Sequence, residues 1–352
     1  MTENPAAPHD RAGGKTLMLS EAAEAPSRIA LQFERNRAAV SRLGEKLRAS
    51  PPRAVVTAAR GSSDNAATFA RYLIETRAAT LTSSQALSVA SVYTAQPRLD
   101  GSLFLAISQS GRSPDLLAAT SAAKAAGAFT VALVNAEDSP LASLADEVIP
   151  LCAGPERSVA ATKTYLAANA AILDLVAAWT ADTELRQAVS NLPALLEKAW
   201  TLDWSVGAQR LTRAQDLYVI GRGLGFGLAQ EAALKFKETC GLHAEAFSAA
   251  EVQHGPMALV GPGFPALIFS QDDETSPGVK ALAKQFIDAG ADTLLAGLRE
   301  DRACNLPTFD AHPALEPVMM AQSFYRLVAA LSAARGFDPD RPRLLNKITE
   351  TI

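Results

Sequence analysis

The sequence predicts an α/β protein made of two tandem units, each a parallel sheet flanked by helices, that arose from one duplicated unit. Short apolar runs typical of buried strands alternate with segments of helical periodicity, which indicates βαβ units. Turns that contain glycine or serine follow several of these strands. The strand–turn–helix pattern around Arg60-Gly61 returns around Arg222-Gly223, an offset of 162 residues (222 − 60).

Fifty residues precede the first domain. Residues 1–16 are polar and lack the apolar segment of a signal peptide, so we expect a disordered leader. Residues 17–50 carry apolar side chains at helical spacing, which predicts a helical arm in which Pro26 divides two helices.

The first sheet domain is expected over residues 51–190. Its strands are predicted at 54–58, 103–107, 130–134 and 147–151. One helix is predicted from the Ser62-Ser63 pair to about Glu75. Another should begin at Pro114, because proline suits the first turn of a helix, and run to about Ala126.

The second sheet domain is expected over residues 191–335, followed by a tail at 336–352. Its clearest strands are predicted at 217–220 and 265–270, and a helix should begin near Leu228.

Charge and cysteine content exclude several classes of protein. The net charge of −4 provides no basic field for nucleic acid, and three scattered cysteines cannot form a disulfide framework. The most apolar stretch, 166–179, is interrupted by Asn169 and Asp174 and is too short to span a membrane. We therefore expect a cytoplasmic protein whose partners are small molecules or a second copy of itself, with neither nucleic acid nor membrane.

A serine-rich loop after the second predicted strand, 108–113, indicates a site for a monophosphate. It places three hydroxyls, one amide and free backbone N–H groups at a helix N-terminus, where the helix dipole favours an anion. Ser62-Ser63 adds hydroxyls at the neighbouring strand end. No P-loop lysine follows, so a nucleoside triphosphate is not expected. An ordinary capped turn is the alternative, in which Ser113 would cap the helix.

The equivalent loop of the second unit, 271–274, is acidic and should repel phosphate. The glycine-rich turn 221–227 does not fit G-x-G-x-x-G, because Phe226 or Leu228 stands where the last glycine should be. We therefore predict no nicotinamide site and no cofactor, and expect these glycines to allow close approach of a ligand or a neighbouring subunit.

Acid–base groups gather in the second unit. Glu231, Lys235 and Glu238 follow one another at i, i+4 and i+7, which places them on one helix face; alone, this pattern also fits a solvated ion-pair face. A polar loop that contains His243 and His254 comes next, and an imidazole is suited to moving a proton on a sugar oxygen. Metal binding by these histidines and Cys240 has no recognised ligand spacing, so no metal is predicted.

Several co-linear motifs resemble the double sugar isomerase (SIS) domain family, and they cover roughly residues 17–352. The most similar members are the isomerase part of glucosamine-6-phosphate synthase and the SIS-type glucosamine-6-phosphate deaminases. The motifs are Ile107-Ser108-Gln109-Ser110-Gly111, Gly154-Pro155-Glu156, Val159-Ala160-Ala161-Thr162-Lys163, Glu231-Ala-Ala-Leu-Lys235-Phe-Lys-Glu238, His243-Ala-Glu-Ala, Glu251-x-x-His254-Gly-Pro and Arg341 to Lys347.

The resemblance implies two flavodoxin-like subdomains and a role for each motif. Glu238 would carry the proton between C1 and C2 of an open-chain sugar, and His254 would assist ring opening across a homodimer interface. Lys347 on the tail would cover the site, while Lys235 and Glu231 would support these groups. Substrate contacts are implied at Ser62, Ser63, Ser108, Gln109, Ser110, Ser113, Val159, Ala161 and Glu231.

Two departures from the synthase bear on the expected reaction. Ala161 stands where the synthase has a serine near the sugar, and no glutaminase segment is recognisable, since the sequence starts Met1-Thr2. The resemblance therefore favours a deaminase that converts glucosamine 6-phosphate to fructose 6-phosphate and ammonia.

Several alternatives remain open. The enzyme types are a deaminase for another hexosamine phosphate, a deglycase for sugar–amine adducts and ammonia-dependent synthesis of glucosamine 6-phosphate. A non-catalytic sugar-phosphate sensor and a pure interaction scaffold belong to other classes, and the retained acid–base residues and the phosphate loop argue against them.

Overall fold

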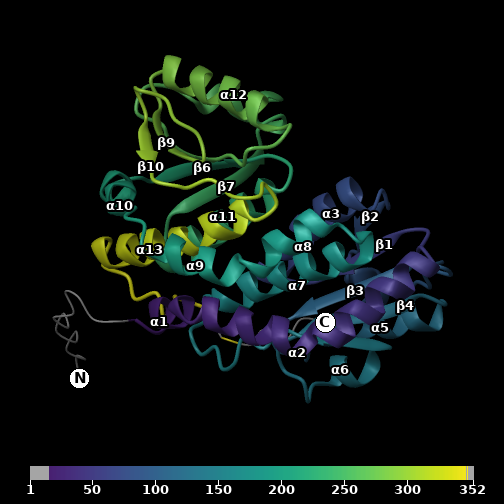
Figure 1. Ribbon diagram of the computed structural model, residues 1–352. Coiled ribbons are helices and arrows are strands. Elements are labelled where there is room, and N and C mark those ends of the chain that lie inside the picture. Colours follow the sequence, from purple (N-terminus) through teal and green to yellow (C-terminus); the bar gives the residue numbers. More distant parts are fainter. Residues whose placement is uncertain (1–15, 346, 348–352) are drawn as a thin grey trace, which may run out of the picture.

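A computed structural model describes residues 16–345 and residue 347 of the chain. Most of the expected leader, residues 1–15, lies outside the described part. Figure 1 shows two lobes, each with its own parallel sheet, and a layer of helices between the sheets. Among the described residues, none of the helices combines the length and the apolar content that a membrane span requires.

The first sheet has the strand order β2-β1-β3-β4-β5. Its strands are β1 (Val55–Ala58), β2 (Thr82–Ser84), β3 (Leu103–Ser108), β4 (Phe129–Val134) and β5 (Glu147–Pro150). All neighbours are parallel. Every residue of β3 is buried, because helices cover both faces of a parallel sheet and leave its central strands apolar throughout.

The second sheet has the strand order β10-β9-β8-β6-β7. Its strands are β6 (Asp216–Gly221), β7 (His243–Ser248), β8 (Pro265–Phe269), β9 (Asp292–Ala296) and β10 (Cys304–Leu306). Numbered from its own first strand, each sheet reads 2-1-3-4-5, the flavodoxin-like order. The predicted architecture of two parallel α/β units is confirmed, and the shared order agrees with a duplicated unit.

Helices of the first unit cover both faces of its sheet. They are α1 (Leu17–Ala23), α2 (Ala25–Ala49), α3 (Ser62–Arg77), α4 (Ser88–Ser91), α5 (Pro114–Ala125), α6 (Pro140–Leu144) and α7 (Lys163–Thr180). Pro26 lies in the first turn of α2 and marks the break from α1, as predicted. Helix α7 is buried on almost all sides, which explains why stretch 166–179 is so apolar.

Helices of the second unit include the one that carries the acid–base residues. They are α9 (Leu192–Trp200), α10 (Ser205–Leu211), α11 (Gly225–Cys240), α12 (Ser276–Asp288) and α13 (Glu316–Ala334), with short 3-10 turns η1 (Glu251–Gln253) and η2 (Pro256–Leu259). Helix α8 (Thr183–Ser190) precedes them and packs on α7 of the first unit. In Figure 1, α12 lies on the outer side of the second sheet, and α11 and α13 lie on the side toward the first unit.

The glycine-rich turn serves packing within the chain. A Cβ on Gly227 would lie 2.6 Å from the carbonyl oxygen of Asn65 and 3.1 Å from the nitrogen of Phe69, both on α3. The close approach predicted for this turn is therefore made by another helix of the same chain. It brings α11 and α3 together and so joins the two units.

The prediction of a loop at His243 is wrong, because His243 begins β7 at the edge of the second sheet. The first side chains of β7 alternate between exposed and buried, as those of an edge strand can.

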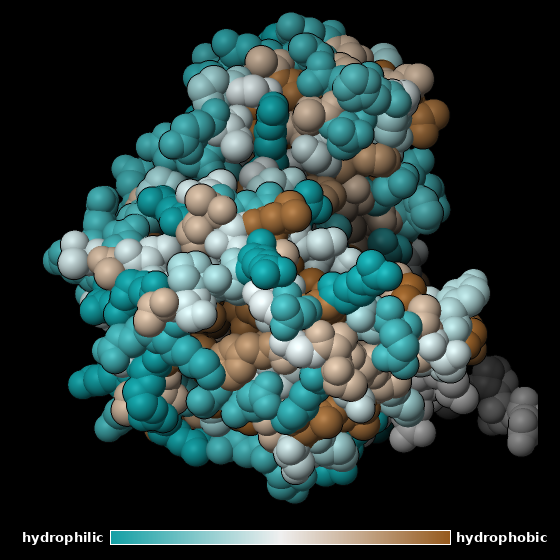
Figure 2. Space-filling view, turned by 90° about the vertical axis from the view of Figure 1, so that its right-hand side faces the viewer, coloured by the Kyte–Doolittle hydropathy of each residue, from teal (hydrophilic) through white to brown (hydrophobic). Residues whose placement is uncertain are grey.

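On the face shown in Figure 2, hydrophilic residues predominate, and the apolar ones lie in small separate groups.

Candidate active site

A cavity of about 270 Å³ lies beyond the C-terminal ends of β1 and β3. These strands flank the point where the strand order reverses, which is where open parallel sheets bind ligands. The cavity is lined by Arg60, Gly61, Ser62, Ser63, Ile107, Ser108, Gln109, Ser110, Ser113, Leu116, Val159, Ala161, Lys235, Glu238, Leu345 and Lys347. It therefore brings together residues of both units and of the C-terminal tail.

The serine-rich loop forms the cavity wall between β3 and α5. The Gly111 N–H donates to Ser108 Oγ at 3.0 Å, and Gly111 has a φ of +62°. A Cβ there would lie 2.3 Å from Ser139 Oγ, so the turn requires glycine. Ser113 occupies the N-cap position of α5, but its side chain makes no capping bond. Ser108 Oγ therefore accepts a hydrogen bond within the loop, whereas the Ser113 hydroxyl makes no capping bond and lines the cavity.

A second helix N-terminus faces the same space. Ser62 and Ser63 are the first residues of α3, directly after Gly61, whose φ is +56°. Helices α3 and α5 both begin at the cavity wall, and their N-terminal N–H groups and dipoles favour an anion.

The equivalent loop of the second unit, after β8, is filled by its own side chains. Gln271 Nε2 donates to Arg222 O at 2.9 Å, Asp273 Oδ2 at 2.8 Å and Thr275 Oγ1 at 2.9 Å. Self-filling, together with the predicted negative charge, distinguishes this loop from the serine-rich one.

Helix α11 carries Glu238, the predicted acid–base group. Lys235 Nζ donates to Glu238 Oε2 at 2.5 Å and lies 3.6 Å from Glu231 Oε1. The Lys235 side chain is 0% exposed, whereas that of Glu238 is 18% exposed and reaches the cavity. Burial lowers the pKa of Lys235, but the Glu231 and Glu238 carboxylates outweigh it and raise the pKa above its usual value. Lys235 therefore stays charged and orients Glu238.

Glu231 anchors this cluster across both units. It accepts hydrogen bonds from Ser62 Oγ at 3.2 Å and Asn65 Nδ2 at 2.9 Å on α3, and from the Tyr325 hydroxyl at 3.1 Å on α13. Burial raises the pKa of Glu231, and Lys235 and the α3 donors partly offset this. Burial and Glu231 raise the pKa of Tyr325, so its phenol keeps its proton and donates. Glu231 itself does not line the cavity.

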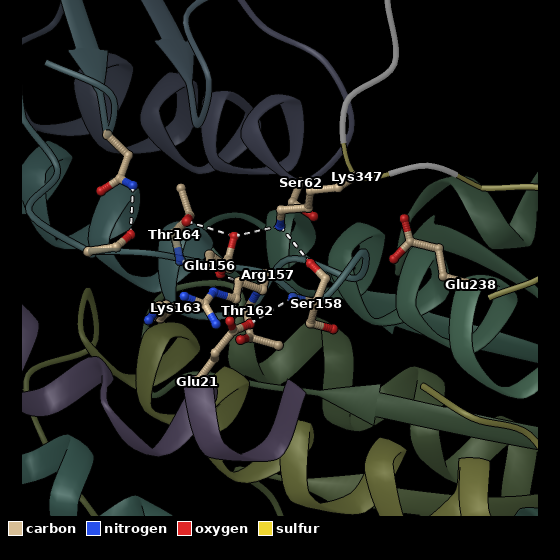
Figure 3. Close-up of polar contacts among 12 residues, drawn as sticks. Glu21, Ser62, Glu156, Arg157, Ser158, Thr162, Lys163, Thr164, Glu238 and Lys347 are labelled. Atoms are coloured by element: carbon tan, nitrogen blue, oxygen red, sulfur yellow. Dashed lines mark hydrogen bonds and ion pairs between the residues drawn. The ribbon is translucent and has the colours of Figure 1, made fainter. Parts of the chain in front are cut away.

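Lys347 reaches the cavity from the tail and is held by the loop before α7 (Figure 3). Its Nζ donates to Glu156 Oε2 at 3.2 Å and to Ser158 O at 2.6 Å. Glu156 also accepts from Thr162 N and Thr164 N at 3.0 and 3.1 Å. Burial raises the pKa of Glu156, but Lys347 and the threonine hydrogen bonds outweigh it and lower the pKa, so Glu156 stays ionised.

The same loop is supported from the other side by α1. Glu21 accepts from the backbone N–H groups of Arg157 at 2.5 Å and Ser158 at 3.2 Å. Val159 and Ala161 follow directly and line the cavity. In Figure 3, Glu238 lies apart from both Lys347 and this loop and makes no hydrogen bond or ion pair with them.

His254 is placed apart from the other candidates. It follows η1, is exposed, and is not among the residues that line the cavity. Cys240 is buried and His243 exposed, and within the described ranges no three His, Cys, Asp or Glu side chains are grouped to hold a metal ion.

Sequence reasoning missed Arg60, Leu116 and Leu345 as lining residues, and Asn65 and Tyr325 as supports of Glu231. Arg60 directly precedes the turn glycine Gly61, and this position was the only available signal for it. Asn65 and Tyr325 lie on helices far apart in the sequence, so nothing in the sequence connects them with Glu231.

A family model for the SIS domain matches residues 46–178 and 210–295, more than half of the chain. The chain belongs to the SIS domain family. The first matched segment contains β1 to β5; the second contains β6 to β8 and most of β9, and β10 lies beyond it.

Relatives of known structure include the crystal structure of a candidate phosphosugar isomerase from Silicibacter pomeroyi DSS-3. It is 41% identical, covers 93% of this SIS protein and 100% of that chain, and has a TM-score of 0.89. The C-terminal domain of glucosamine-fructose-6-phosphate aminotransferase from Francisella tularensis is 26% identical over 95% of this chain and 100% of that chain, with a TM-score of 0.85. A glucosamine-6-phosphate deaminase from Thermotoga maritima shares the fold, with 20% identity, coverage of 96% of this chain and 100% of that chain, and a TM-score of 0.77.

Curated relatives include the isomerizing glutamine–fructose-6-phosphate aminotransferase of Aeropyrum pernix. It is 35% identical over 96% of this chain. The SIS chain spans 57% of that relative's length, so the relative also has parts without a counterpart here.

Proposed function

We propose that this SIS protein is a phosphosugar isomerase that deaminates glucosamine 6-phosphate to fructose 6-phosphate and ammonia. The observation that carries the proposal is the single cavity in which two helix N-termini, the Glu238 carboxylate and the Lys347 ammonium meet. The phosphate would be held at one end and the reacting carbons at the other. The names of two of the similar structures, a candidate phosphosugar isomerase and a glucosamine-fructose-6-phosphate aminotransferase, both refer to sugar phosphates and support this substrate class.

Proton transfer between adjacent carbons needs one base that returns the proton it takes. Glu238 takes the C2 proton of the open-chain aldose, the electron pair forms a C1–C2 double bond, and O1 receives a proton, for which the Lys347 ammonium is a suitable donor. The product is an enolamine. Glu238 then protonates C1, which leaves an imine at C2; water adds there and ammonia leaves, giving the C2 ketone.

The proposal is tested by following ammonia and fructose 6-phosphate released from glucosamine 6-phosphate by the purified protein. Glu238→Gln should lose at least about 1,000-fold in turnover, because an amide cannot accept the proton. If the protein releases ammonia from none of the hexosamine phosphates, the deaminase assignment is wrong. Full turnover by Glu238→Gln would show that another group is the base.

The same residues would serve ammonia-dependent synthesis, since a catalyst accelerates a reaction in both directions. They also suit another hexosamine phosphate or a sugar–amine adduct. Ala161, on the cavity wall, offers a methyl group where the synthase has a serine, so it cannot make the hydroxyl contact to the sugar that the resemblance implies for the synthase. A panel of hexosamine phosphates that differ at C4 and in N-acetylation measures the preference.

We further propose a homodimer with shared sites. His254 is exposed and outside the cavity of its own chain, so its expected role in ring opening would need a second subunit.

A further inference from the structure

Arg60 has no role so far, yet it lines the cavity beside the phosphate loop. Its Nε and Nη2 donate to Asp115 Oδ2 at 2.9 and 2.8 Å. Asp115 lies in the first turn of α5, two residues after Ser113, and is 0% exposed. The guanidinium therefore bridges the turn after β1 and the helix after β3, the two segments whose serines face the cavity.

The way Arg60 binds Asp115 leaves part of its guanidinium for a ligand. Nε and Nη2 lie on one edge of the planar group, and both point to a single carboxylate oxygen. The opposite edge carries Nη1, which no acceptor in the described ranges engages through a hydrogen bond, and the side chain is 54% exposed. Such an edge matches two phosphate oxygens.

The distribution of charged groups in the cavity also favours Arg60 as a phosphate ligand. A phosphomonoester carries nearly two negative charges at neutral pH. Of the lining cations, Lys235 is fully buried between two carboxylates, and Lys347 is 24% exposed and bound to Glu156. Asp115 and, through its electrostatic effect, Asp64 are the acidic groups that face Arg60. Only Arg60 combines high exposure with a place next to the serines.

We propose that Arg60 is a specificity-determining residue that binds the substrate phosphate through the Nη1 edge of its guanidinium, with Asp115 as its positioning residue. This inference rests on the proposed function. Arg60 selects dianionic phosphomonoesters over unphosphorylated sugars. The serine hydroxyls and helix N-termini carry only partial positive charges, whereas the Arg60 guanidinium offers a full positive charge to the second negative charge of the phosphate.

The test is calorimetric titration with inorganic phosphate and with fructose 6-phosphate. Arg60→Gln should weaken binding of both at least about tenfold, as expected for loss of a charge-assisted pair of hydrogen bonds. Arg60→Lys keeps the charge but loses the fork, so we expect a loss of about threefold. Arg112→Gln is the matched control. Arg112 is exposed in the same serine-rich loop but does not line the cavity, so binding should stay within about twofold.

Thermal unfolding of each variant shows whether the fold is kept, and Arg60→Lys decides the question if Arg60→Gln does not fold. One outcome would overturn the role of Arg60 and leave the proposed function intact. In it, the wild type binds fructose 6-phosphate, and Arg60→Lys and any folded Arg60→Gln protein bind it equally well. A wild-type protein that binds neither ligand would overturn both. Because binding is measured without turnover, a failure of deamination alone leaves this test valid.

Discussion

At the scale of single residues, Glu156 is the group that places Lys347. Its Oε1 accepts the backbone N–H groups of Thr162 and Thr164, and its Oε2 accepts from Lys347 and the Thr164 hydroxyl. Glu156→Gln can keep the backbone bonds through its amide oxygen, but its amide nitrogen cannot accept from an ammonium. We therefore expect at least a tenfold loss of kcat, roughly the effect of one charged hydrogen bond, with phosphate binding retained.

Ser158→Ala is the control for Glu156→Gln. Lys347 binds the backbone carbonyl of Ser158, and the Ser158 hydroxyl has no hydrogen-bond partner in the described part of the chain. Its kcat should match the wild type in a steady-state assay. Equal losses in both variants would show that the loop, rather than the Glu156 charge, matters.

Asp174 is a residue where burial costs stability. Burial in α7 raises its pKa to about 6, and the charges of Arg186 and Arg37 offset this only in part. The folded state then binds the Asp174 proton more tightly than the unfolded state does. The contribution of protonated Asp174 to the free energy of unfolding is therefore fully present below the unfolded pKa and is lost as pH rises through about 6. Asp174→Asn should raise the free energy of unfolding at pH 8 by about 2 kcal/mol and leave it unchanged near pH 4. Urea unfolding at both pH values measures this, and equal stability at pH 8 would contradict it.

At the scale of elements, the contact between α11 and α3 holds the two units together. Gly227→Ala would push a methyl group to 2.6 Å from Asn65 O, which is backbone and cannot move alone. We expect a loss of about 2 kcal/mol in thermal or urea unfolding, together with lower activity, because Glu231 and its α3 partners shift with the helix.

Gly261→Ala is the matched control for Gly227→Ala, since a Cβ at Gly261 meets nothing within 4 Å. It should change stability by less than about 0.5 kcal/mol. A Gly227→Ala protein as stable as this control would mean that the helices separate without cost.

The elements that the sequence predicted are the ones with a strong periodic signal. Strand β3 is a run of apolar residues buried on both faces, and α5 has a proline in its first turn. Strand β2 has only three residues and β7 has polar residues at an edge, so neither carries the apolar run of a buried strand. Their pairing depends on neighbours far along the chain, which single-sequence periodicity does not contain.

At the scale of the whole molecule, the proposed dimer predicts complementation between defective subunits. Glu238→Gln and His254→Ala each should be nearly inactive, because one lacks the base and the other the ring-opening group. Mixed under conditions that exchange subunits, they should regain about a quarter of wild-type activity if each mixed dimer has one intact site and half of the dimers are mixed. Light scattering of each variant checks the dimer; no gain on mixing would place His254 outside the partner's site.

The parts of the site that depend on local sequence motifs were predicted, and the contacts between distant segments were not. The serine-rich loop, Glu238 and the tail residue Lys347 were predicted, and the structure brings them to one cavity. The arrangement that holds them was not predicted: Glu21 under the loop at Ser158 and Tyr325 on Glu231 are contacts between distant segments. The expected roles of individual residues rest on family motifs, because spacing alone also fitted a solvated ion-pair face for Glu231, Lys235 and Glu238.

The self-filled loop at Gln271 bears on how such a chain evolves. The amide nitrogen of Gln271 is engaged by Arg222, Asp273 and Thr275 within the protein, so it is not available to a ligand, and we expect selection on this loop for stability alone. Under the proposed function, the serine-rich loop is under selection both for stability and for holding a phosphate. Descendants should therefore accumulate substitutions faster at 271–275 than at 108–113.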